Sequence, residues 1–158
     1  MQREFLTVNN TLIVGFKGKN NTSSMLVEQL LSDNLLLTNS FAGLKKDIDS
    51  ISGEYDQIVM FGVDKELTSG VRIERVAAKD GVKYFTKLNL EEIQESLNCV
   101  GITTIISENP TAYLCNEAYW YMLKRFVGRA VFIHVPTMKN VDEDFVQSMK
   151  QADLKGEL

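Results

Sequence analysis

The sequence predicts an α/β protein, a three-layer α/β/α sandwich with a mostly parallel central sheet. Three observations lead to this fold class. Apolar runs of strand length alternate with amphipathic stretches of helical length. The apolar runs are nearly continuous, which is typical of strands buried on both faces of a parallel sheet. No linker, internal repeat or low-complexity tract interrupts the alternation, so we expect a single domain over residues 1–158.

In the first half of the chain, the order of elements begins with a short apolar strand. The predicted strands cover residues 11–16, 35–38, 56–62 and 71–77, and the predicted helices cover residues 24–32 and 41–51. Asn21, Thr22 or Ser23 can cap the first helix. The stretch from 71 to 77 alternates apolar and charged residues, and this pattern predicts a strand with one exposed face.

The second half repeats this order of elements. Helices are predicted over residues 90–97, 111–126 and 142–152, and strands over residues 101–106 and 130–135. Asn89 can cap the first of these helices, and Pro136 ends the last strand. Ligands bind beyond the carboxyl ends of strands in an open α/β sheet, so we expect the candidate side chains that follow strands to meet at one edge.

Charge and composition exclude several classes of function. The chain has 17 basic and 21 acidic residues, a net charge of −4, and its basic residues are scattered, so we expect no nucleic-acid partner. No apolar run approaches the ~20 residues that cross a bilayer, and no apolar stretch of signal-peptide length follows Met1–Val8. We therefore expect a cytoplasmic protein with no membrane partner. Two cysteines without a CxxC pair, and a single histidine, argue against a disulfide framework and a metal site.

Cys115 is the first candidate for chemistry, because it follows a predicted strand and stands near the start of a predicted helix. The unpaired amides and the dipole at a helix N-terminus lower the pKa of a thiol and can stabilise an oxyanion. If Asn109 caps the helix and Pro110 is its first residue, Cys115 lies beyond the first turn. If this stretch is a loop, Cys115 is well placed at the helix start. The other interpretation is a small buried cysteine in the core, and we adopt it for Cys99.

His134 lies at the end of a strand, where a neutral imidazole could take the proton of a thiol and later protonate a leaving amine. Its other interpretation is a ring whose nitrogens are satisfied by backbone carbonyls. Glu74 is a candidate for the acid that orients this histidine, because it stands beside apolar residues in an alternating strand. Alternatively, Glu74 lies on a solvated strand face that it shares with Arg72.

Three short segments resemble the signature blocks of the pyroglutamyl peptidase I family, also called pyrrolidone-carboxylate peptidases, and occur in the family's order. These segments are Ile73–Ala77, Tyr113–Asn116 and Phe132–Pro136. Leu12–Phe16 also resembles the family's first strand, and Tyr84–Leu88 resembles its middle segment. The resemblance spans nearly the whole chain and implies the phosphorylase/hydrolase-like fold of the family.

The resemblance also implies a cysteine peptidase that needs no cofactor. Carried over block by block, it implies Cys115 as the nucleophile, His134 as the general base and acid, and Glu74 as the residue that orients His134. The implied reaction removes an N-terminal pyroglutamyl group, or a related small acyl group, from a small peptide or N-acyl amine through a thioester. The implied protein is cytoplasmic and forms a homo-oligomer.

The sequence departs from the family where the family binds its substrate. Phe16 matches the first aromatic residue of the substrate pocket, but the loop over residues 15–21 is short and has no counterpart of the second. Val63 stands where the family has a glutamine near the substrate lactam. A pocket without this partner would leave the buried amide of the substrate lactam unpaired, which lowers the preference for a pyroglutamyl substrate by about 1–3 kcal/mol. A second interpretation is therefore a non-catalytic or re-specified relative that binds a small ligand or a partner subunit.

Overall fold

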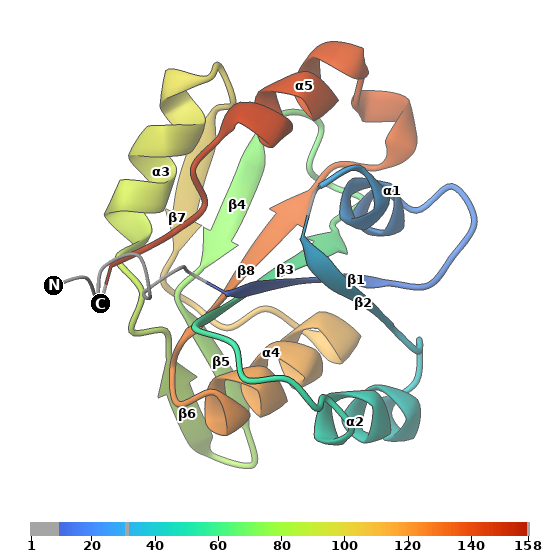
Figure 1. The fold of residues 1–158 in the computed structure, drawn as a ribbon, viewed down its shortest axis with the longest axis vertical. Coiled ribbons are helices and arrows are strands. Elements are labelled where there is room, and N and C mark those ends of the chain that lie inside the picture. Colours follow the sequence, from blue (N-terminus) through green and yellow to red (C-terminus); the bar gives the residue numbers. More distant parts are fainter. Residues whose placement is uncertain (1–9, 31, 158) are drawn as a thin grey trace, which may run out of the picture.

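The computed structural model describes residues 10–30 and 32–157 of the chain (Figure 1). Within these residues the main sheet comprises β1 (Thr11–Phe16), β2 (Asp33–Leu37), β3 (Gln57–Val63), β4 (Val71–Glu74), β7 (Thr104–Ser107) and β8 (Ala130–Val135). A separate antiparallel hairpin comprises β5 (Val76–Lys79) and β6 (Val82–Phe85). The helices are α1 (Thr22–Gln29), α2 (Phe41–Asp49), α3 (Leu90–Cys99), α4 (Tyr113–Arg125) and α5 (Glu143–Gln151), with a 3-10 turn η2 (Met138–Asn140). The expectation for Met1–Val8 lies outside the described residues.

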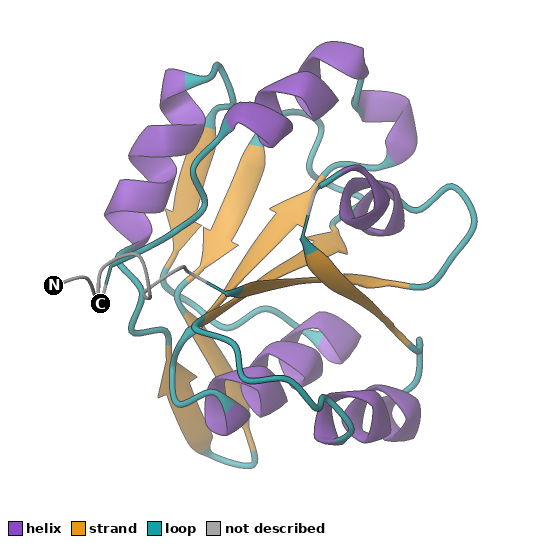
Figure 2. Cartoon of the chain, in the orientation of Figure 1, coloured by secondary structure: helices purple, strands orange, loops and turns teal. Residues whose placement is uncertain are grey.

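The strand order of the main sheet is β2-β1-β3-β8-β4-β7. Neighbouring strands are parallel, except that β4 runs antiparallel to β8. Helices α1, α3 and α5 cover one face of the sheet, while α2, α4 and the β5–β6 hairpin cover the other (Figure 1, Figure 2). The predicted three-layer sandwich with a mostly parallel sheet is therefore confirmed. Among the described residues, every helix is too short or too polar to cross a membrane.

Burial on both faces explains why the strand sequences are apolar throughout. In β8, Phe132 packs into the layer of α2 and α4, and the next residue, Ile133, packs into the layer of α1, α3 and α5. Three helices on one face of the sheet begin at side-chain caps: Asn21, Asn89 and Asp142 each accept a backbone N–H in the first turn of α1, α3 and α5. Of the three residues considered as the cap of α1, Asn21 is the one that caps it, and the predicted cap at Asn89 is confirmed.

The segment 71–77 was expected to form one strand with an exposed face, and this prediction is wrong in both respects. Residues 71–74 form β4, which lies inside the sheet between β8 and β7, and β5 begins at Val76 in the separate hairpin. The charged residues that suggested a solvent face pair with each other instead, with Arg72 Nε 2.7 Å from Glu74 Oε2. The other predicted elements have counterparts whose ends differ by at most three residues.

The reversed direction of β4 and β7 determines where α4 begins. These two strands run opposite to β8, so the last residues of β7 lie at the same end of the sheet as the first residues of β8. The chain then crosses back through residues 108–112, and Figure 1 shows this crossing as the yellow-to-orange loop that enters α4. The start of α4 therefore lies near the ends of β3 and β8, although α4 follows β7 in the sequence.

Candidate functional site

Cys115 and His134 line one cavity at the ends of β3 and β8. Gly62 of β3 is paired in register with His134 of β8, and a Cβ atom built on Gly62 would lie 2.9 Å from Cys115 Sγ. The sulfur therefore packs against β3, on the strand next to the imidazole. The cavity has a volume of about 380 Å³. It is lined by Val63, Asp64, Lys65, Glu66, Thr111, Ala112, Tyr113, Leu114, Cys115 and His134.

Glu74 and His134 form a buried hydrogen-bonded pair. Glu74 Oε2 lies 2.8 Å from His134 Nδ1, and the two side chains are 1% and 3% exposed. A carboxylate only accepts hydrogen bonds, so Nδ1 carries the proton in this bond and Nε2 keeps its lone pair. Glu74 therefore does not lie on a solvated face, and a carboxylate rather than a backbone carbonyl orients the ring. Within the described residues, the ring's side-chain partners are Glu74 and Arg72 and do not include the Cys115 sulfur.

Arg72 and Asp64 extend this pair into a network that the sequence reasoning missed. Arg72 Nε donates to Glu74 Oε2 at 2.7 Å, and Arg72 Nη2 lies 2.8 Å from Asp64 Oδ2. The same Nη2 lies 3.2 Å from His134 Nδ1. Residues two apart on a strand share a face, so the spacing of Arg72 and Glu74 was a usable signal. Asp64 follows β3, and no local pattern connects it to β4.

Hydrogen bonding and burial act in opposite directions on the charges of this network. Burial by itself lowers the pKa of Arg72, but its bonds to Glu74 and Asp64 hold that pKa above the usual value. Burial by itself raises the pKa of Asp64, but the backbone N–H of Glu66 and the guanidinium of Arg72 hold that pKa below its usual value. Asp64 and Arg72 therefore remain an ion pair at neutral pH.

Helix α4 begins at Tyr113, which places Cys115 in its first turn. Asn109 and Pro110 thus belong to the loop, and this decides between the two helix starts considered above. The N-cap residue is Ala112, whose side chain makes no capping bond, so the first amides of the helix lack a side-chain acceptor at the cap. Residues 112–115, which carry these amides, line the cavity. Tyr113 has a φ of 59°, a left-handed conformation that is uncommon for a residue other than glycine. Backbone strain of this kind often occurs at functional sites.

The pKa of Cys115 is raised to about 12. Burial is the largest cause, the carboxylates of Glu74 and Asp64 add to it, and the guanidinium of Arg72 acts in the opposite direction. The sequence led us to expect a lowered pKa at the helix N-terminus, but burial and the two nearby anions act in the opposite direction and the pKa is raised. The thiol is protonated at neutral pH, so it needs a base to become a nucleophile.

Two polar side chains of α4 fix the helix against the rest of the site. Tyr119 Oη donates to the backbone carbonyl of Glu74 at 2.7 Å. Asn116 bonds twice to the backbone of Ala78 in β5, with Nδ2 donating to its carbonyl at 2.7 Å and Oδ1 accepting from its N–H at 3.0 Å. These bonds tie the helix that carries Cys115 to the segment that carries Glu74.

Of the two predicted substrate-binding residues, Val63 lines the cavity and Phe16 does not. Phe16 is 5% exposed, and its ring centroid lies 6.4 Å from that of Phe132, which in turn lies 4.8 Å from that of His134. Phe16 thus reaches the site only through the core. Cys99 was expected in the core, but it is exposed at the end of α3. It lies outside the face formed by residues 90, 93 and 97, which α3 buries.

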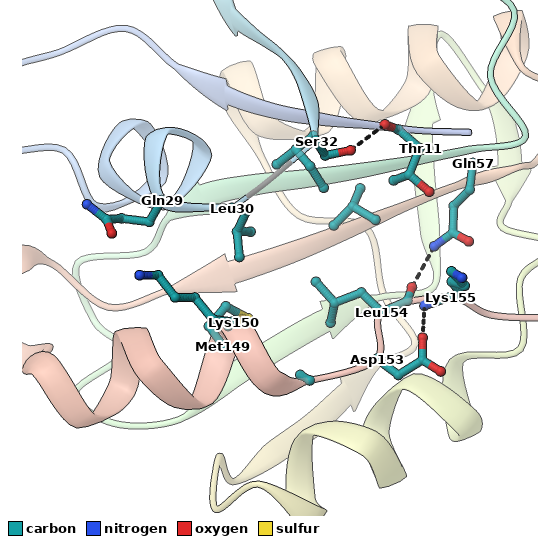
Figure 3. A pocket seen from close by; sticks show the side chains of 13 residues that line it. Thr11, Gln29, Leu30, Ser32, Gln57, Met149, Lys150, Asp153, Leu154 and Lys155 are labelled. Atoms are coloured by element: carbon teal, nitrogen blue, oxygen red, sulfur yellow. Dashed lines mark hydrogen bonds between the residues drawn. The ribbon is translucent and has the colours of Figure 1, made fainter. Parts of the chain in front are cut away.

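A second cavity, of about 430 Å³, lies at the opposite end of the sheet between α1, α5 and the first residues of β1 and β3 (Figure 3). Its most buried polar side chain, Gln57, donates through Nε2 to the carbonyl of Leu154 at 2.6 Å. None of the candidate site residues lines it. In the described part of the chain, no three His, Cys, Asp or Glu side chains gather closely enough to hold a metal ion.

The fold is that of known pyrrolidone carboxyl peptidases, as the sequence resemblance predicted. The pyrrolidone carboxyl peptidase from Thermococcus litoralis matches with a TM-score of 0.74 and 17% identity over 91% of each chain. The enzyme of that name from Fervidobacterium islandicum matches with a TM-score of 0.74 and 19% identity, covering 90% of this chain and 94% of that one. Pyroglutamyl peptidase I from Bacillus amyloliquefaciens gives a TM-score of 0.74 and 17% identity over 94% and 97%. No family model matches the sequence, and no curated protein is significantly similar to it.

Proposed function

We propose that this chain is a cysteine peptidase of the pyroglutamyl type. Its substrate is a small peptide or N-acyl amine, from which it removes an N-terminal pyroglutamyl group or a related small acyl group. The observation that carries the proposal is the buried pair of Glu74 and His134 at 2.8 Å, in the same cavity as Cys115. The fold that this chain shares with pyrrolidone carboxyl peptidases supports the same activity.

The reaction begins with transfer of the Cys115 proton to Nε2 of His134. This transfer is required because the pKa of the thiol is about 12, and catalytic hydrogen bonds of this kind often tighten only when substrate is bound. The sulfur attacks the acyl carbon, and the amides of the first turn of α4 stabilise the resulting oxyanion. Glu74, which accepts from Nδ1, stabilises the imidazolium.

The intermediate then collapses to a thioester. The carbon–nitrogen bond breaks, and His134 gives its proton to the leaving amine. Water next loses a proton to Nε2 and attacks the thioester carbon, which forms the free acid. The carbon–sulfur bond breaks, and the proton returns from His134 to the sulfur of Cys115. Atoms and charges balance without a metal or cofactor, so we expect the activity to resist a chelator.

A fluorogenic pyroglutamyl amide tests this proposal directly. We expect release of the fluorophore by the wild type, and loss of that release in Cys115→Ala and in His134→Ala. Cys99→Ala is the matched control, because Cys99 is exposed on α3 and lies away from the cavity, and it should keep wild-type activity. If neither the wild type nor Cys115→Ala releases the fluorophore, a pyroglutamyl group is not the substrate.

The second candidate function is a non-catalytic or re-specified relative that binds a small ligand or a partner subunit. Two observations favour it: Val63 offers no side-chain hydrogen bond to a lactam, and Phe16 is buried in the core rather than in the cavity wall. A panel of small acyl amides, with mass spectrometry of the intact protein to detect an acyl group on Cys115, separates the two candidates. Acylation by a substrate other than pyroglutamate supports a changed specificity, and absence of any acylation supports a binding protein.

We further propose that the protein acts in the cytoplasm as a homo-oligomer, as the resemblance implies. Light scattering coupled to size-exclusion chromatography measures the oligomeric state. A mass equal to that of one chain at all concentrations would contradict this part of the proposal.

A further inference from the structure

His134 Nδ1 has two side-chain neighbours that require opposite protonation states. Glu74 Oε2, at 2.8 Å, can only accept a hydrogen bond, so it pairs with a protonated Nδ1. Arg72 Nη2, at 3.2 Å, can only donate, so it pairs with an Nδ1 that has lost its proton. One nitrogen cannot satisfy both neighbours at once. The two contacts therefore correspond to two tautomers of the neutral ring.

The two tautomers differ in whether the ring can act as a base toward the thiol. With the proton on Nδ1, the lone pair of Nε2 is free and can take the proton of Cys115. With Arg72 donating to Nδ1, the proton lies on Nε2, and the ring has no lone pair left for the thiol. Because the thiol is protonated at neutral pH, only the first tautomer supports nucleophilic attack.

Asp64 is positioned to decide between these tautomers. Its Oδ2 lies 2.8 Å from Arg72 Nη2, closer than that nitrogen lies to His134 Nδ1. Asp64 is itself fixed, because its backbone N–H donates to the carbonyl of Val135 at 3.0 Å and its Oδ1 accepts from the N–H of Glu66 at 2.9 Å. Arg72 Nε also donates to the other carboxylate, that of Glu74, which contacts the ring. The guanidinium is thus held between two carboxylates, and its Nη2 is directed toward the one farther from the ring.

We propose that Asp64 and Arg72 are positioning residues that keep His134 in the tautomer with the proton on Nδ1. Asp64 draws Nη2 of Arg72 away from the ring, which leaves Glu74 as the partner of Nδ1. Among the described residues, Glu74 and Arg72 from β4 contact the ring through hydrogen-bonding atoms. The other charged or titratable side chains that line the same cavity as the ring are Asp64, Lys65 and Glu66 from the loop after β3, and Tyr113 and Cys115 from α4. The catalytic consequence rests on the proposed function, whereas the tautomer of His134 does not.

His134 is the single histidine of the chain, so its ring can be observed without overlap. In protein labelled with ¹⁵N-histidine, at a pH where the ring is neutral, the ¹⁵N shifts distinguish a protonated Nδ1 from a protonated Nε2. We expect protonated Nδ1 in the wild type. In Asp64→Ala we expect a shift of population toward protonated Nε2, because the guanidinium is free to donate to Nδ1. A wild-type ring protonated on Nε2, or an unchanged ring in Asp64→Ala, overturns the proposal.

A second substitution separates the effect of Asp64 from simple damage to the fold. Adding Arg72→Met to Asp64→Ala removes the competing donor, so protonated Nδ1 should return. For the active enzyme, we expect kcat to fall by at least roughly tenfold in Asp64→Ala, up to the ~10²–10⁴-fold that a positioned base contributes in full, and to recover in part in the double variant. Asp49→Ala is the matched control, because Asp49 pairs with Lys45 at 2.7 Å on the exposed side of α2. It should change neither the tautomer nor kcat.

These outcomes keep the two proposals apart. A ring that changes tautomer as expected in a protein with no peptidase activity supports the role of Asp64 and contradicts the proposed function. If the protein is an active peptidase and the tautomer of His134 does not change in Asp64→Ala, the result supports the function and overturns the positioning role. If Asp64→Ala does not fold, Asp64→Leu keeps a similar branched side-chain shape while removing both the charge and the acceptor oxygens that hold Arg72 Nη2. The same shift toward protonated Nε2 is expected, and an unchanged tautomer again overturns the proposal.

Discussion

The sulfur of Cys115 occupies space that only a glycine at position 62 leaves free. A Cβ atom at Gly62 would lie 2.9 Å from Sγ of Cys115 and 2.6 Å from Cζ of Phe132. Real Cβ atoms do not approach other atoms so closely, so either the helix or the strand would have to move. The position of the Cys115 sulfur therefore depends on the absence of a side chain at position 62 of β3.

The first prediction concerns this contact. We expect Gly62→Ala to displace Cys115 and Phe132, to destabilise the protein by about 1–3 kcal/mol as overpacking does, and to lower activity more than stability alone explains. Urea unfolding measures the first effect, and activity on a fluorogenic acyl amide under fully folded conditions measures the second. Alkylation of exposed Cys99 is the internal control and should not change. Wild-type stability and activity in this variant would show that the contact is not restrictive.

The second prediction concerns pH. The pKa of Cys115 is about 12 in the folded protein and 9.0 for an ordinary cysteine, so the folded state holds its proton more tightly than the unfolded state. This group stabilises the fold fully below pH 9.0, and the stabilisation is lost as pH rises toward 12. We expect Cys115→Ala to lose less stability than the wild type across this range in urea unfolding. Cys99→Ala should follow the wild-type curve, and parallel curves for all three proteins would contradict the raised pKa.

The third prediction concerns the acid of the site. Glu74→Gln keeps the size of the side chain, but its amide can donate to Nδ1 of His134 and favour the wrong tautomer. If the proposed reaction is correct, kcat/KM should fall by about 10²–10⁴-fold, the range that a positioned base contributes. Glu108→Gln is the matched control, since Glu108 pairs with Arg75 at 2.9 Å with its side chain 64% exposed. Equal kcat/KM values for both variants would show that Glu74 does not orient the ring.

The fourth prediction concerns the support of Glu74 from α4. Tyr119→Phe removes the hydrogen bond to the carbonyl of Glu74 and leaves that buried oxygen without this donor. We expect a loss of about 1–3 kcal/mol in the free energy of unfolding, measured by urea denaturation. Tyr121→Phe, a half-buried position two residues along the same helix, is the control and should cost much less. Similar losses in the two variants would mean that the hydroxyl of Tyr119 has no special role.

Local sequence patterns were sufficient to predict most of the fold. Continuous apolar runs marked the strands buried on both faces, such as β3 and β8, and polar caps such as Asn21 and Asn89 marked the helix starts. The alternation of apolar and charged residues over 71–77 led to the wrong prediction of an exposed strand face. A charged residue on a strand gives this alternation whether it contacts water or an opposite charge. Arg72 and Glu74 satisfy each other inside the sheet, and only the pairing of β4 with β8 reveals this.

The candidate site could be predicted only in part for related reasons. The residue types of Cys115, His134 and Glu74 were visible in the sequence, but the helix start was not, because a left-handed Tyr113 leaves no sequence signal. The role of Asp64 depends on a contact between a loop after β3 and a side chain of β4. The burial that raises the pKa of Cys115 likewise arises from packing between segments distant in the chain.

Because β4 runs antiparallel to β8, Glu74 and His134 meet inside the sheet, while the wall of the cavity is formed by other segments. The carboxylate of Glu74 and the imidazole of His134 are held by backbone ladders within the sheet, whereas most of the cavity wall comes from residues 63–66 and 111–115. If the proposed reaction is correct, insertions or deletions in those outer segments can alter which acyl groups are accepted while Glu74 and His134 stay in place. Under the same proposal, the acyl group that is bound can change without any change to the residues that transfer the proton.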